Sequence, residues 1–174
     1  MPRPRDELTA AEWALLALLS ERPAHGFALA RDTSPEGQVG RVWALRRPLV
    51  YRALETLERM QLIRAAGTVP SHSGPQRTIL EPTPAGERAV LTWLSEPVEH
   101  VRDARSMLML KLLFLSRRNA DPEPLLSAQR EHFLTHTDSL ASAAAHADGF
   151  DRALLLWRLE STTAVIRFTE AMLA

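Results

Sequence analysis

The side chains with the most distinctive spacing are arginines gathered around one proline. Arg46 and Arg47 precede Pro48, and Tyr51 and Arg52 follow it within about one helical turn. A guanidinium group can donate two parallel hydrogen bonds to a guanine edge or one charged bond to a phosphate. This set at the start of a helix therefore favours contact with nucleic acid, although a solvated basic face is the alternative.

Charge is sorted along the chain, although the 174 residues sum to a net charge of zero. Between Arg41 and Arg77 there are seven arginines and two glutamates, a local balance of +5. From Glu96 onward, nine basic residues face eleven acidic ones, a balance of −2. Binding of a polyanion depends more on such a local basic segment than on the net charge of the whole chain.

An amphipathic helix must present these arginines. Its inward stripe is expected to comprise Leu49, Val50, Ala53, Leu54, Leu57 and Met60. Pro48 suits the first helical turn, where its missing N–H costs nothing. The outward face carries Arg47, Tyr51, Arg52, Glu55 and Arg59. Core packing of Tyr51, and a surface ion pair of Arg52 with Glu55 or Glu58, are the alternatives to DNA contact.

Short elements are expected on both sides of this helix. Thr9 and Glu12 have capping-box spacing and start a helix that ends before Pro23. A second helix is expected at about 24–31. Two strands, 62–65 and 77–81, would flank a polar loop at 70–75, and a helix would then run from 84 to 94. The hairpin tip would carry His72, Gln76 and Arg77.

Three helices are expected in the second half of the chain, at 107–115, about 121–147 and about 150–173. The segment 107–115 is apolar on every side, which is typical of a helix buried by its neighbours. The last helix has an apolar seam of Phe150, Leu154, Trp157, Ser161, Val165, Phe168 and Met172. Such a seam indicates packing between helices, within one chain or between two. The expected fold class is mainly α with a small β-hairpin.

Several ordered motifs between Leu8 and Pro97 resemble PadR-type transcriptional regulators. They are Leu8–Leu19, Pro23–Leu29 with its His-Gly-aromatic signature, Val50–Glu58, Leu62-Ile63, Thr83–Gly86 and Trp93-Leu94. The second half of the chain agrees with the longer members in layout. The resemblance implies an N-terminal winged helix-turn-helix domain (residues 1–97) and a C-terminal region of antiparallel helices for dimerisation and possible effector binding (98–174).

The resemblance also implies a function. A homodimeric repressor would bind a palindromic site in double-stranded DNA and release it when a small molecule binds. Tyr51 and Arg52 are the first candidates for DNA contact, followed by Arg46, Arg47 and the wing residue Arg77. The sequence departs from the family pattern at Arg46–Leu49, where relatives often carry Gly or Ser. It also departs at Leu80 and Pro82, where a tyrosine-containing motif is usual.

Other side chains have more than one interpretation. An aromatic or hydrophobic effector could contact Trp13, Trp93, Trp157 and Phe168, or these four residues could belong to plain core. His25 is expected to bond a backbone group. His132 and His136 have a spacing that a metal could use, but a solvated helix face is the preferred interpretation.

No enzyme activity, metal or cofactor is expected. The chain has no cysteine, and neither a nucleophile motif nor a phosphate-binding glycine loop stands out. The start of the chain lacks the features of a secretory signal, so a cytoplasmic protein is expected. The alternative function is a winged-helix module that binds protein and not specific DNA. Because phosphate neutralisation releases counterions, steep salt dependence of binding would separate the two.

Overall fold

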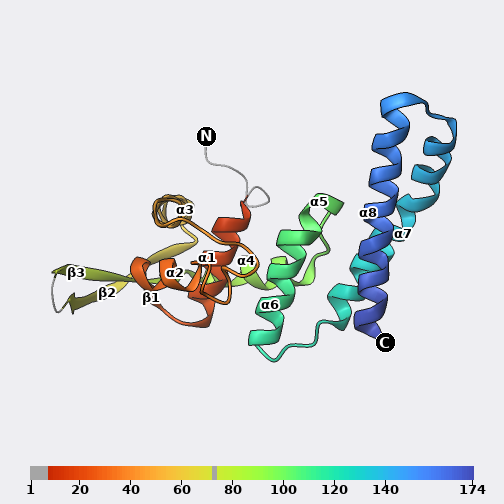
Figure 1. Cartoon of the computed structure of the whole chain (residues 1–174). Coiled ribbons are helices and arrows are strands. Elements are labelled where there is room, and N and C mark those ends of the chain that lie inside the picture. Colours follow the sequence, from red (N-terminus) through yellow and green to blue (C-terminus); the bar gives the residue numbers. More distant parts are fainter. Residues whose placement is uncertain (1–7, 72–73) are drawn as a thin grey trace. The chain divides into compact units, whose positions relative to one another are not determined.

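The computed structural model describes residues 8–71 and 74–174. They divide into two compact units, with the boundary between Leu94 and Ser95, and the units are described separately. The helices that begin in the first unit are α1 (Ala10–Glu21), α2 (Gly26–Asp32), α3 (Arg47–Arg59) and α4 (Pro84–Ser95). Its strands are β1 (Ala24–His25), β2 (Ile63–Ser71) and β3 (Gly74–Pro82) (Figure 1). The expected fold class, mainly α with a small hairpin, is confirmed.

Helix α1 starts with the expected capping box. The Glu12 carboxylate accepts a hydrogen bond from the Thr9 N–H at 2.7 Å, and the Thr9 hydroxyl accepts from the Glu12 N–H at 3.4 Å. These two bonds satisfy backbone donors that the helix itself cannot pair. The eight residues from Glu12 to Leu19 are all buried, so α1 is the central helix of the first unit.

The sheet is antiparallel with the strand order β1-β3-β2. Both strands of the hairpin are longer than expected, and the expected helix 24–31 is wrong at its start. Ala24 pairs with Leu80 and His25 with Ile79, so these two residues form a strand, and α2 begins at Gly26. Local sequence could not predict this strand, because its hydrogen-bond partners lie more than fifty residues further along the chain.

Helix α3 buries the middle of its expected apolar stripe. Val50 and Leu57 are fully buried, and Ala53 and Leu54 nearly so. Leu49 is 44% exposed, so its assignment to the inward face is wrong. At 3.6 residues per turn it lies about 90° from the middle of the buried stripe, and this position leaves its side chain at the edge of the contact.

Two tryptophans join α1 to α4 in the core of the first unit. The rings of Trp13 and Trp93 stack at a centroid distance of 5.0 Å with 6° between their planes. Both side chains are buried, so this contact removes a large apolar area from water. At the other end of α4, the Thr83 hydroxyl accepts a hydrogen bond from the Gly86 N–H at 3.1 Å, which supports the expected helix start.

The second unit is helical. It contains α5 (Val101–Asp103), a π-helical turn η2 (Ala104–Leu108), α6 (Met109–Arg117), α7 (Glu123–His146) and α8 (Gly149–Leu173). The two long helices run antiparallel because only Ala147 and Asp148 connect them (Figure 1). Within the described residues, no helix combines the length and apolar character needed to cross a membrane.

The expected buried helix at 107–115 is split between η2 and α6. Leu108, Leu110 and Phe114 are fully buried, as a segment apolar on every side predicts. Lys111 is buried with them, and its Nζ donates a hydrogen bond to the Glu96 carbonyl at 2.6 Å. Burial lowers the pKa of Lys111 to about 8, although the Glu96 charge opposes this shift.

The face of α8 that is buried within this chain differs from the apolar seam expected from the sequence. Its buried residues are Thr162, Ile166 and Thr169, spaced by four and three. In the seam, Phe150 is 79% exposed and Trp157 72%, while Val165 and Phe168 are partly buried against the core. Sequence periodicity could not distinguish the two faces, because two of the three buried residues are threonines and add no apolar signal.

Candidate nucleic-acid interface

The five residues predicted to contact DNA are all exposed. Four lie at the start of α3, where Arg46 is the N-cap residue and Arg47 begins the helix. Tyr51 is 40% exposed, so it is not a core residue. In the part of the chain that the structure describes, Arg52 forms neither of the surface ion pairs considered as alternatives. All four side chains are therefore available to a ligand.

Phe27 brings the predicted residues of two different elements together. The guanidinium carbons of Arg47 on α3 and Arg77 on β3 each lie 5.1 Å from the centre of its ring. Arg47 also lies 5.9 Å from the centre of the Tyr51 ring. We call Phe27, Arg47, Tyr51 and Arg77 the Phe27 cluster. Arg46 and Arg52 make no such contact with it among the described residues.

Phe27 itself was not among the predicted contact residues. It is 45% exposed, although a phenylalanine normally gains from burial. The signal that could have found it is its position after His25-Gly26, where α2 has just begun. Its two cation–π contacts, worth about 0.5–1 kcal/mol each at exposed sites, stabilise the ring at the surface.

His25 has the structural role expected from the sequence. It caps α2, because its Nδ1 accepts a hydrogen bond from the Ala28 N–H at 3.0 Å. Its other ring nitrogen, Nε2, lies 3.5 Å from Nη1 of Arg77. His72, which the sequence places at the hairpin tip, lies outside the described residues. Gln76 is exposed, as expected of a residue near the tip.

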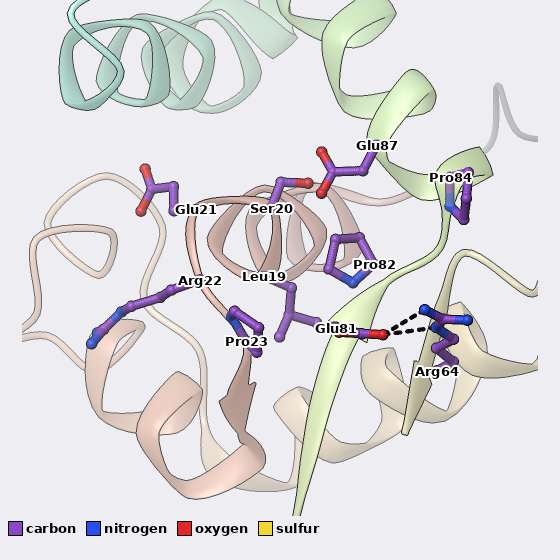
Figure 2. A pocket seen from close by; sticks show the side chains of 10 residues that line it. All are labelled: Leu19, Ser20, Glu21, Arg22, Pro23, Arg64, Glu81, Pro82, Pro84 and Glu87. Atoms are coloured by element: carbon purple, nitrogen blue, oxygen red, sulfur yellow. Dashed lines mark hydrogen bonds and ion pairs between the residues drawn. The ribbon is translucent and has the colours of Figure 1, made fainter. Parts of the chain in front are cut away.

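The arginines of the basic segment differ in whether a carboxylate compensates their charge. Arg64 forms an ion pair with Glu81 at 2.7 Å and lines a hollow of about 500 Å³ that also contains Glu21 and Glu87 (Figure 2). In the described residues, no carboxylate forms an ion pair with Arg47 or Arg77. Arg47 and Arg77 therefore keep an uncompensated positive charge, whereas the charge of Arg64 is neutralised locally.

The four candidate effector residues are not lined up along one hollow. Trp13 and Trp93 are the stacked pair in the core of the first unit. In the second unit, Trp157 lines a hollow of about 680 Å³ together with Phe133, His132 and Arg158. Phe168 packs partly against the core of that unit and does not line the hollow. Contact of any of the four with an effector stays a prediction.

His132 and His136 lie close together on α7. Their ring centres are 5.3 Å apart, and Nε2 of His132 lies 3.1 Å from the Glu99 carbonyl oxygen. Within the described ranges, no group of three or more His, Asp or Glu side chains could hold a metal ion. The pair belongs to the wall of the hollow around Trp157.

The order and packing of these elements define a winged helix-turn-helix domain. Helix α3 packs its apolar side on α1 and α2, and its arginine-bearing side is exposed. The β2–β3 hairpin forms the wing, and β3 carries Arg77 to the Phe27 cluster. A helix of this size fits the DNA major groove, which is about 12 Å wide, and an adjacent wing can reach the flanking backbone.

No family model and no curated protein matches the chain. Among solved structures, it is similar to Bacillus subtilis PadR in complex with operator DNA, with 19% identity and a TM-score of 0.47 over 94% of this chain and 97% of that one. It is also similar to smu.1604c from Streptococcus mutans UA159, with 15% identity and a TM-score of 0.44 over 93% and 97%. The similarity to Bacillus subtilis PadR alone has 20% identity and a TM-score of 0.43, over 99% of this chain and 97% of that one.

Proposed function

We propose that this protein is a DNA-binding transcriptional regulator of the PadR type. One observation carries the proposal: α3 presents exposed arginines at its start, and those at the Phe27 cluster have no carboxylate partner among the described residues. Holding cations together without a counter-charge is unfavourable, and a polyanionic ligand would remove this cost. The ordered sequence motifs between Leu8 and Pro97 support the same assignment. In this proposal residues 1–97 bind the DNA.

The same protein acts as a homodimer, joined through residues 98–174. The support is the seam of α8, where Phe150 and Trp157 expose large apolar side chains that α7 does not cover. Exposed apolar surface of this kind favours association. A two-fold axis would place two α3 helices about 34 Å apart, one turn of DNA, on a palindromic site.

Regulation completes the proposal. The protein represses its target genes and releases DNA when an aromatic or hydrophobic small molecule binds. The hollow beside Trp157 and Phe133 is the site that we assign to this molecule, because aromatic walls with a few basic groups suit an apolar ligand with a polar end. Binding there would change DNA affinity only if the DNA-bound state and the released state of the dimer have different affinities for the ligand.

Selection of bound sequences from random duplex DNA tests the proposal directly. We expect a palindromic consensus and an affinity that falls steeply with salt, since each neutralised phosphate adds about 0.9 to the slope of log K against log salt. Recovery of no consensus, with weak and salt-independent retention, would instead favour a winged-helix module that binds protein.

A further inference from the structure

Two hydrogen-bond donors converge where His25 meets Arg77. The Ala28 N–H donates to Nδ1 of His25 at 3.0 Å, so Nδ1 carries a lone pair and the imidazole proton must be on Nε2. The Nε2 atom lies 3.5 Å from Nη1 of Arg77. A guanidinium has no acceptor, so the two nitrogens cannot bond each other. Both need an acceptor from outside the pair.

The sheet register holds this pair of donors in place. His25 on β1 is paired with Ile79 on β3, and Arg77 stands two residues before Ile79. Side chains two residues apart on a strand project from the same face, so Arg77 is a diagonal neighbour of His25. The centre of the Phe27 ring lies 5.1 Å from the guanidinium carbon of Arg77, and this cation–π contact also holds Arg77 in place. The convergence therefore follows from backbone pairing and ring contact together.

A negatively charged acceptor suits this pair of donors best. No carboxylate forms an ion pair with Arg77 or with neighbouring Arg47 in the ranges that the structure describes, and Arg77 is exposed. A phosphate oxygen can accept from an imidazole N–H and a guanidinium at once, and its charge strengthens both bonds. The required donors are side chains, and no backbone N–H of the short helix α2 takes part.

We propose that His25 Nε2 and the Arg77 guanidinium bind one phosphate of the DNA backbone together. His25 then has two roles, because one ring nitrogen caps α2 and the other contacts DNA. The contact fixes the position of β1 and β3 on the backbone beside the groove that α3 enters. This inference rests on the proposed DNA-binding function.

Two substitutions separate the roles of His25. In His25→Asn the amide oxygen replaces Nδ1 as the cap acceptor, because Asn is a favoured N-cap residue, but no donor remains at the position of Nε2. In His25→Ala both groups are lost. We expect the thermal midpoint to fall in His25→Ala and to stay near that of the unchanged protein in His25→Asn. For a duplex obtained by selection from random DNA, His25→Asn should weaken binding about 3- to 10-fold.

A double-variant cycle tests whether the phosphate is shared. Arg77→Gln should weaken binding and lower the salt slope by about 0.9. If both side chains bind one phosphate, the fold-loss of DNA affinity in the double variant His25→Asn/Arg77→Gln should be smaller than the product of the fold-losses in the two single variants. Replacing single phosphates of the duplex by neutral methylphosphonates should reveal one position whose replacement weakens binding of the unchanged protein, weakens binding of each single variant less, and has little effect on the double variant.

The outcomes distinguish this inference from the function on which it rests. DNA binding by His25→Asn equal to that of the unchanged protein, or effects that multiply in the double variant, would overturn the shared phosphate and leave DNA binding intact. If the unchanged protein selects no duplex at all, the proposed function fails and this inference fails with it.

Discussion

Gly26 lies against the ring of Tyr51. A Cβ atom at Gly26 would stand 2.8 Å from Cε1 of Tyr51, closer than side chains approach one another. The residue between His25 and Phe27 must therefore be small if Tyr51 is to keep its position on the surface of α3. This contact links the start of α2 to the start of α3.

Gly26→Ala should weaken DNA binding more than it weakens the fold. The ring of Tyr51 is exposed and can swing away, so we expect the free energy of unfolding to change by no more than about 1 kcal/mol. DNA affinity should fall roughly 5- to 20-fold, because the displaced ring loses its contact. Denaturant unfolding and titration of a selected duplex measure the two quantities. In a Tyr51→Ala background, Gly26→Ala should have no further effect on affinity; a full additional loss would contradict the link.

Arg52→Ala should weaken specific binding by about 1–3 kcal/mol and relax the preference at one position of the site. Arg52 is exposed near the start of α3 and forms no ion pair within the described residues, so its guanidinium can reach a base edge. Competition between the selected duplex and duplexes altered at single positions measures this. An equal loss for every sequence would identify Arg52 as a phosphate contact.

Arg47→Gln should lower the slope of log K against log salt by about 0.9, because one phosphate would lose its cation. Arg64→Gln is the matched control: it removes the same charge from the same basic segment, but the charge of Arg64 is already compensated by Glu81 at 2.7 Å. Its slope should remain near that of the unchanged protein. Equal slopes for the two variants would show that local compensation does not decide which arginines bind DNA.

Trp157→Glu should break the dimer. If the seam of α8 is the interface, the substitution replaces a large apolar side chain of that interface by a carboxylate that loses its water, and the dissociation constant should rise by at least about 100-fold. Sedimentation equilibrium measures it. Leu91→Glu on α4, a similar change at a residue that is 58% exposed, is the control and should leave association unchanged. A Trp157→Glu protein that remains dimeric would exclude this part of the seam from the interface.

Lys111 should make stability increase with pH above about 8. Its pKa is about 8 in the folded chain and near 10.5 when exposed, so between these values the unfolded chain binds more protons than the folded one. The free energy of unfolding should therefore rise across this window, by at most about 1.4 kcal/mol per pH unit. Urea unfolding at several pH values measures it, and Lys111→Met should remove this part of the slope. An identical pH profile in both proteins would place the titration elsewhere.

Local patterns in the sequence predicted most of the elements. The capping box of Thr9 and Glu12, the position of Pro48 in the first turn of α3 and the apolar segment around Phe114 all depend on residues a few positions apart. The helix starts and the buried segment that they produce can therefore be predicted from the sequence alone. The exposure of Tyr51 followed from helical periodicity, and the basic segment followed from the order of charges along the chain. These features were enough to predict a winged helix and the part of it that would face DNA.

The tertiary structure decided which of these residues meet. Ala24 became a strand because Leu80 supplies its partner, and Leu49 was left exposed because neighbouring helices cover only the middle of its stripe. Arg47 and Arg77 are thirty positions apart, and only the packing of α3 beside the wing brings them to Phe27. Periodicity describes one element at a time, whereas these contacts depend on how separate elements pack. For this reason, the sequence determined which residues are candidates for DNA contact, and the fold determined how they are grouped.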